Sequence, residues 1–293
     1  MKYKKYISSL VIVIVLLSAA ATVCGLLPGA GHEYVFKSLH GETVTIYGRG
    51  LYQYDSVASV VQTKAQDFVT LLLGIPMLII ALIMSLKGQL RGRLLLAGTL
   101  GYFLYTYMSY SFLAMYNYMF LAYVLLMSAS FFAFVLTLMS FDVQSLSRSF
   151  AEKFPVRLIG GVLIFVAVGI ALMWLGRIVP PLAAGSQPQG LEHYTTLVIQ
   201  VMDLGFVVPA ALVAGLLILK RKAFGFLLAP VIIIKSATLL IAITAMAVMM
   251  VVSGEAVNYI EMAVFLIFDF LVVFCLYIVM KNIKEPKSGL AAD

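Results

Sequence analysis

The sequence predicts an all-α integral membrane protein: a bundle of about eight transmembrane helices with a small extracytoplasmic β-hairpin. Three observations lead to this class. Hydrophobic residues make up 63% of the 293-residue chain and charged residues only 11%, whereas soluble domains are nearer half apolar and a quarter charged. Apolar runs of about 20 residues, long enough to cross a bilayer, recur along the chain. Lys and Arg gather in alternate connections between these runs, as they do on the cytoplasmic side of membrane proteins.

The composition excludes other classes. A disordered chain, a collagen-like fibre and a disulfide scaffold do not fit the apolar fraction, the 22 Gly without a three-residue period and the two Cys. The net charge of +7 would suggest nucleic acid binding in a soluble protein. Here the positive residues lie between the apolar runs, so they indicate orientation and contact with anionic lipid head groups. No nucleic acid partner is expected.

Eight apolar runs are long enough to span the bilayer. Short connections separate most of them, which makes consecutive runs antiparallel neighbours. The chain is therefore expected to form one polytopic membrane domain over residues 1–293. The expected spans are residues 6–27, 66–86, 94–116, 118–140, 157–178, 196–219, 223–252 and 257–280.

Positive charge orients these spans. Fifteen of the twenty Lys and Arg residues lie in the N-terminal segment, in every second connection and in the C-terminal tail. Four lie on the opposite side, and one, Lys235, lies deep inside a span. The positive-inside rule therefore places both termini in the cytoplasm, and the even number of spans agrees with it. We expect a prokaryotic cytoplasmic membrane, with the lipid bilayer as the main partner.

The first run has a second interpretation, because a basic start followed by an apolar centre also begins a secretory signal. The run from Ile7 to Leu27 is longer than a typical signal core, and residues 28–31 make a poor cleavage site. A retained helix is therefore favoured, while cleavage would leave seven spans.

Residues 28–65 form the longest connection and the expected place for structure outside the bilayer. Two β-prone runs, residues 33–37 and 43–47, flank a turn and predict a hairpin. From Asp55 onward, apolar residues at helical spacing predict a short helix that leads into the second span. This connection is the candidate surface for a protein partner.

Three residues match when the chain is shifted so that Pro76 falls on Pro209, which is one sign of an internal repeat. Each half, about residues 1–140 and 157–281, would contain four spans and return to the side it left. The halves would then be parallel repeats about an axis along the membrane normal. Shared hairpin chemistry also explains the matches, so both interpretations stay open. The matches at this constant offset, called the repeat offset below, are Pro76 with Pro209, Lys87 with Lys220 and Gly92 with Gly225.

Two ionisable residues lie near the middle of the bilayer, where a charge must pair or face a cavity. Lys235 is thirteen residues from Lys222, roughly 20 Å along a helix, and Asp269 is twelve residues from Lys281, roughly 18 Å from the same surface. Both lie on neighbouring spans at similar depth. We expect them to pair, either lining a polar cavity that binds a proton or an anionic group, or as a static ion pair that fixes helix register.

Further polar groups lie nearer the outer surface. Asp203 and Gln200 precede Gly205 and Pro209, which predicts a locally opened outer half of the sixth span. Glu261 and Asp67 are either part of an acidic vestibule that opens outward or interfacial residues that reach water. The vestibule would combine Asp203, Gln200 and Glu261 with Gln66, Asp67 and Thr70 at the top of the second span.

Tyr102 and Tyr105 lie deep in the third span, where their hydroxyls need partners within the bundle. They are expected either to hydrogen-bond across a helix interface or to line a ligand cavity.

No metal or cofactor is expected. His32, His40 and His193 lie in outer connections without metal-binding spacing. Cys24 and Cys275 fall near opposite ends of the first and eighth spans, too far apart for a disulfide. The sequence has no phosphate-binding glycine loop, nucleophile elbow or zincin motif, so no catalytic residue is assigned.

Three functions remain. The favoured one is a transporter or ligand-binding membrane protein, with a vestibule that leads to Lys235 and Asp269 and takes a small molecule or an ion. The alternative is a non-catalytic receptor, sensor or assembly component that uses residues 28–65. An intramembrane enzyme built on Asp203, Asp269 and the outer histidines has the least support, because the motifs of known chemistries are absent.

Overall fold

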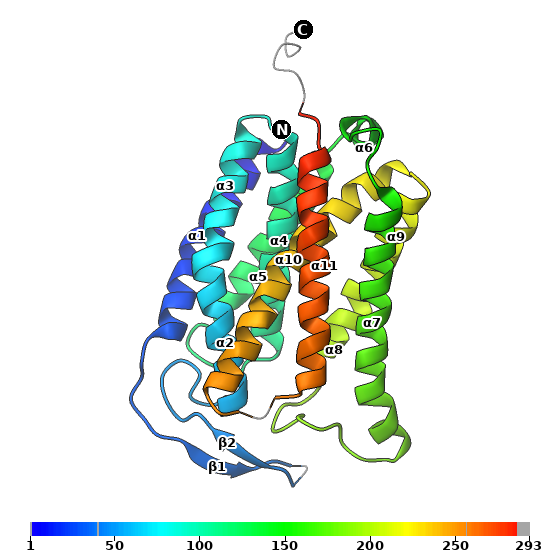
Figure 1. Cartoon of the computed structure of the whole chain (residues 1–293). Helices are drawn as coiled ribbons and strands as arrows, with labels where there is room; N and C mark the ends of the chain where they lie inside the picture. The colour runs from blue at the N-terminus through cyan, green and yellow to red at the C-terminus, as the bar shows by residue number, and fades with distance from the viewer. Residues whose placement is uncertain (1, 40, 256, 286–293) are drawn as a thin grey trace.

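The computed structural model describes residues 2–39, 41–255 and 257–285. Long helices stand side by side in a bundle, with a two-stranded hairpin at one end (Figure 1). In chain order the elements are α1 (Lys4–Leu26), β1 (Tyr34–Lys37), β2 (Thr43–Ile46), α2 (Val57–Val69), the π-helical turn η1 (Thr70–Gly74), α3 (Ile75–Leu86), α4 (Leu90–Phe112), α5 (Phe120–Met139), α6 (Val143–Leu146), the 3-10 turn η2 (Ser147–Ser149), α7 (Val156–Ala183), α8 (Val198–Met202), the π-helical turn η3 (Asp203–Val207), α9 (Val208–Leu219), α10 (Ala223–Val252) and α11 (Tyr259–Asn282).

Within the described ranges, seven helical segments are long and apolar enough to cross a bilayer. They are α1, α2 through α3, α5, α7, α8 through α9, α10 and α11. The third expected span corresponds to α4, which has the length of α1 but is not among the seven. Its tyrosines and serines make it less apolar, and many of its side chains are buried by protein.

Each expected span coincides with a helix, and two boundaries differ by five residues or more. α2 begins at Val57, nine residues before the expected second span, because the helix expected after Asp55 is continuous with it. α7 continues to Ala183, past the expected end at 178 and through Pro180 and Pro181. The last turn stays helical because the backbone N–H groups of residues 184–186, after the prolines, donate to carbonyls of that turn.

The two ends of the bundle differ. The start of α1 and the end of α11 lie together, with the α3–α4 and α9–α10 connections at the same end (Figure 1). The hairpin lies at the opposite end, called the hairpin end below. β1 and β2 pair antiparallel from Tyr34 with Ile46 to Lys37 with Thr43, as the two β-prone runs predict.

The backbone recurs at the repeat offset, the one that carries Pro76 onto Pro209. η1 and η3 begin at Thr70 and Asp203, and α3 and α9 begin and end at positions with the same offset. α4 and α10 also begin at equivalent positions, Leu90 and Ala223. In both halves a proline is the second residue after the π-helical turn, where its missing N–H breaks the regular ladder.

α4 and α10 form the centre of the bundle. α4 packs against α3, α5 and α10, while α10 packs against α2, α4, α9 and α11. The two central helices approach closely at Gly98, because a Cβ there would meet Ile234 and the carbonyl of Val231. This crossing joins the N-terminal and C-terminal halves of the chain.

Candidate functional site

Asp203, the first residue of η3, holds two neighbouring helices to α8. Tyr105 of α4 donates its hydroxyl to Oδ1 at 2.8 Å, and Trp174 of α7 donates its indole N–H to Oδ2 at 2.8 Å. Asp203 is buried. Its carboxylate is therefore fixed from both sides, and the π-helical turn that presents it is a feature frequent at functional sites.

Lys235 of α10 lies on the same tyrosine. Its Nζ is 4.0 Å from the centre of the Tyr105 ring, close enough for a cation–π interaction. Only 9% of the residue is exposed, and Nζ has no hydrogen-bond partner in the described part of the chain. Tyr105 thus connects the ammonium, on its ring face, to the Asp203 carboxylate, on its hydroxyl.

The expected pairing of Lys235 with Asp269 is wrong. Asp269 accepts a hydrogen bond from Thr244 at 3.1 Å, and no ion pair joins it to Lys235 among the described residues. Thr244 is nine residues beyond Lys235, about two and a half turns, so the two project from opposite faces of α10. Asp269 therefore meets α10 about 13 Å along the helix from Lys235 and on another face, which keeps it away from the ammonium.

Glu261 belongs to the start of α11. Asn258 caps this helix by accepting from the backbone N–H groups of Ile260 and Glu261, and it donates to the Glu261 carboxylate at 3.1 Å. This contact is exposed. Glu261 therefore lies in the capped first turn of α11 and holds the Asn258 side chain in place, consistent with its interfacial interpretation.

Asp67, by contrast, is not an interfacial residue that reaches water. Only 1% of it is exposed, and it accepts hydrogen bonds from Tyr52 at 2.7 Å and Tyr110 at 3.0 Å. Gly25 of α1 has no side chain, which leaves room for Asp67 and Tyr52. Asp67 and Asp203 thus lie in two separate hydrogen-bonded clusters, and no hydrogen bond joins the two among the described residues.

Tyr102 joins α4 to α2 and η1. Its hydroxyl accepts from Gln66 at 2.7 Å and lies 2.8 Å from the Thr70 hydroxyl. Gln66 also donates to Thr106 at 3.2 Å. Both Tyr102 and Tyr105 therefore hydrogen-bond across helix interfaces, which is the first of their two expected roles.

A cavity of about 490 Å³ lies at the hairpin end, next to Asp203. Gln200 and Leu204, the residues three before and one after Asp203, both line it. On α7 it reaches Ile178, one helical turn from Trp174 toward the hairpin end. The remaining lining comes mostly from the α7–α8 connection: Gln187, Pro188, Leu191, Thr195, Thr196, Leu197 and Val201.

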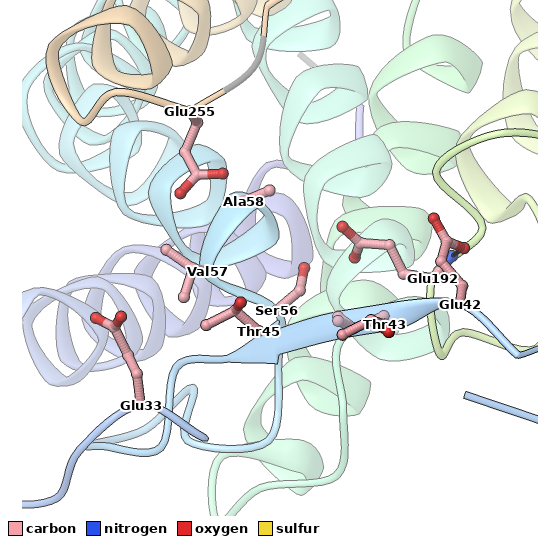
Figure 2. Close-up of a pocket in the computed structure, with 10 residues that line it drawn as sticks. Glu33, Glu42, Thr43, Thr45, Ser56, Val57, Ala58, Glu192 and Glu255 are labelled. Carbon is pink, nitrogen blue, oxygen red and sulfur yellow. Dashed lines mark hydrogen bonds between the residues drawn. The ribbon is translucent and has the colours of Figure 1, made fainter. Parts of the chain in front are cut away.

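A second cavity of about 320 Å³ is acidic (Figure 2). Four glutamates line it from four different segments, together with residues of β2 and the start of α2. In the described part of the chain, no group of three His, Cys, Asp or Glu residues is arranged to hold a metal ion. The four glutamates are Glu33, Glu42, Glu192 and Glu255.

Asp55 ties three connections together at the hairpin end. Its Oδ1 accepts from the Met115 backbone N–H and from the Tyr194 hydroxyl, each at 3.0 Å. Next to Tyr194, the ring of His193 lies 2.9 Å from the Tyr54 carbonyl through Nε2. Burial raises the pKa of Asp55 to about 6 and also raises the pKa of Glu192. Asp55 thus anchors the connection that covers the larger cavity.

Protonation of Asp55 is expected to stabilise the protein. Its pKa is 3.8 in an unfolded chain and about 6 here, so the folded state binds this proton more tightly. The full stabilisation is present below pH 3.8 and is lost as the pH rises through about 6. Over this range the free energy of unfolding changes by about 3 kcal/mol. The free energy of unfolding in mixed micelles, measured across this pH range, should therefore fall as the pH rises.

Asp55→Asn is the matched control, because the asparagine carbonyl can accept the same two hydrogen bonds but does not titrate in this range. It should remove most of the slope, while Glu192→Gln should remove a smaller part. An unchanged slope in Asp55→Asn would contradict the assignment.

Three residues of these clusters carry signals too weak to identify from sequence. Trp174 resembles any other apolar residue of its span, and Tyr52 resembles an ordinary loop residue. Asp55 resembles a polar residue at a helix start, one position before Ser56, the cap of α2, which accepts from the Ser59 N–H. Of the other outer histidines, His32 lines neither cavity, and His40 lies outside the described residues.

Comparison with known proteins gives no assignment, since no family model, curated protein or solved structure matches this chain.

Proposed function

We propose that this chain is an eight-span integral membrane protein that binds a small amphipathic ligand next to Asp203, as a transporter or a ligand-responsive receptor. The observation that carries this proposal is the 490 Å³ cavity whose lining includes the helix neighbours of Asp203. A cavity of this size fits a small organic ligand. Asp203, Tyr105 and Lys235 are then the polar centre that responds to the ligand.

The membrane placement rests on apolarity and charge. Seven segments satisfy the requirements for a span, and α4 is the eighth, because its polar groups are buried by its neighbours rather than exposed to lipid. The end of the bundle opposite the hairpin carries the Lys- and Arg-rich connections and is the cytoplasmic side. The hairpin end is then extracytoplasmic, and the ligand reaches Asp203 from outside.

The burial of Lys235 supports a role beyond structure. An ammonium without hydrogen bonds in a membrane interior is costly, and Asp203 already receives two donors. The Tyr105 side chain links Lys235 to this carboxylate, so a proton or ligand that alters Asp203 also alters the surroundings of the ammonium. The site is suited to couple ligand binding beside α7 and α8 to the central helix α10.

A second candidate function is an assembly component that uses the hairpin. All four residues of β1 are exposed, among them the apolar Tyr34, Val35 and Phe36. Leu39, in the turn that follows, is fully exposed. An exposed apolar strand of this kind favours contact with another protein.

The tryptophan tests the proposed cavity, because the chain has only one. Trp174 bonds Asp203 and lies one turn from the cavity residue Ile178. Titration of the protein in nanodiscs with bromohexanol, an amphipathic heavy-atom quencher, should quench Trp174 emission with a saturable component.

Leu204→Phe, which adds volume to the cavity lining, should remove the saturable component. Leu216→Phe makes the same change on an exposed position of α9 and should retain it. Purely linear quenching of the unaltered protein, or saturation that persists in folded Leu204→Phe, would overturn the proposed site.

A further inference from the structure

The backbone repeat makes Gln200 the counterpart of Asp67. Both residues lie three positions before their π-helical turn, and the helices that follow, α3 and α9, have equivalent bounds at the repeat offset. The flanking helices also correspond, since α1 packs on η1 and α3 in one half, while α7 packs on η3 and α9 in the other. The spaces beside Asp67 and Gln200 are therefore comparable.

In the N-terminal half this space is filled by the chain itself. Tyr52, from the α1–α2 connection, is 2% exposed and packs with Cys24 of α1 and Val60 of α2. Its hydroxyl donates to Asp67 at 2.7 Å. The space beside Asp67 is thus filled by a phenol ring whose hydroxyl bonds Asp67.

In the C-terminal half the corresponding space is the 490 Å³ cavity. The α7–α8 connection covers it but inserts no aromatic ring, because the lining residues it provides are aliphatic, Thr, Gln or Pro. Gln200 is 6% exposed and lines the cavity, yet no hydrogen bond to its side-chain amide is found among the described residues. The residue is buried, but its amide atoms keep some accessible surface, so the amide is open to a polar group of a ligand in the cavity.

We propose that this cavity binds a neutral phenolic ligand, whose ring takes the place that Tyr52 takes in the other half and whose hydroxyl bonds Gln200. This inference rests on the proposed function and names its ligand class.

The lining fits such a ligand. Ile178, Leu191 and Leu204 provide apolar contact for a ring, and none of the lining residues carries a charge. The Gln200 amide can accept from the phenol hydroxyl and donate to its oxygen. Val201 lines the cavity and is more than half exposed, so the cavity reaches the surface of the protein, where a lipid-soluble molecule can arrive.

Three probes of similar size test the ligand class. Trp174 emission, excited beyond the absorption of phenol, is titrated with p-cresol, toluene and hexanol in nanodiscs. p-Cresol has both ring and hydroxyl, toluene has only the ring, and hexanol has only the hydroxyl. p-Cresol should bind about tenfold more tightly than either of the others, as expected for one buried hydrogen bond combined with ring contact.

Gln200→Leu should abolish the preference for p-cresol over toluene, while Gln187→Leu, at another glutamine of the lining, should retain it. Equal affinities for p-cresol and toluene, or for p-cresol and hexanol, would overturn the phenolic ligand and leave the cavity as a binding site. Absence of saturable binding by all three probes, together with linear quenching by bromohexanol, would overturn the proposed function as well.

The N-terminal half provides an independent test. Tyr52→Ala should lower the thermal stability, and p-cresol should restore part of it by occupying the vacated space, with toluene restoring less because it cannot bond Asp67. If p-cresol and toluene raise the melting temperature of Tyr52→Ala equally, the hydroxyl does not define the occupant of this space and the comparison of the two halves fails. Should Tyr52→Ala not fold, the Gln200 variants still decide the proposal.

Discussion

Asp203→Ala is expected to destabilise the protein by about 3–5 kcal/mol. The change leaves the Tyr105 hydroxyl and the Trp174 indole N–H without their acceptor, and it leaves Lys235 as an uncompensated buried cation. Lys235→Met should change stability by no more than about 1 kcal/mol, because it removes an unbonded ammonium and keeps a flexible apolar side chain on the Tyr105 ring. Unfolding in mixed micelles measures both effects.

The double variant Asp203→Ala with Lys235→Met should recover part of the loss, giving a coupling of about 1–2 kcal/mol. Asp269→Leu is the control at the other mid-bundle carboxylate. It should lose only the Thr244 hydrogen bond and show no coupling with Lys235→Met. If Lys235 couples with Asp269 and not with Asp203, the carboxylate that balances the Lys235 ammonium is Asp269, and the assignment to Asp203 is wrong.

Gly98→Leu is expected to separate the two central helices and to destabilise the protein by about 3 kcal/mol or more. Even a Cβ at residue 98 would overlap Ile234 and press on the Val231 carbonyl, and the two halves of the chain meet here. Overpacking of a well-packed interface costs about 1–3 kcal/mol, and a full leucine at a backbone crossing exceeds that range. The yield of folded protein and its melting temperature should both fall.

Gly176→Leu is the matched control, because a Cβ at residue 176 of α7 has no neighbour within 4 Å. Replacing glycine in a helix favours the helix by up to about 1 kcal/mol, so this variant should be neutral or slightly stabilised. Equal damage from the two substitutions would show that the crossing at Gly98 is not specific.

The error over Asp269 shows what helix counting can predict. Lys235 and Asp269 do lie on neighbouring helices, but the count of residues from the basic connections gives only a distance along each helix, and Asp269 meets α10 at Thr244, nine residues beyond Lys235. Which face of a helix carries a residue relative to each neighbour depends on packing. The Lys235 stem lies against α4, where Gly101 leaves space for it, while the face that meets Asp269 carries Thr244.

The error over Asp67 has a related cause. A carboxylate near the end of a span is usually interfacial, and the sequence gives no sign that Tyr52, fifteen residues earlier, folds back onto it. Asp55 is similar, since its partners Met115 and Tyr194 are 60 and 139 residues away. Such pairings depend on connections whose paths follow no periodic pattern in the sequence.

By itself, the sequence determined the helical class, the approximate limits of the long helices and the hairpin. These follow from local rules, because about 20 apolar residues are the length that a helix needs to cross a bilayer, and turn residues between β-prone runs favour a hairpin. Only the tertiary structure decided that Tyr105 links Lys235 to Asp203, that Tyr52 fills the space beside Asp67, and that the equivalent space beside Gln200 is open. Those outcomes depend on helix rotation and on the paths of the connections, which are set by packing between residues far apart in the chain.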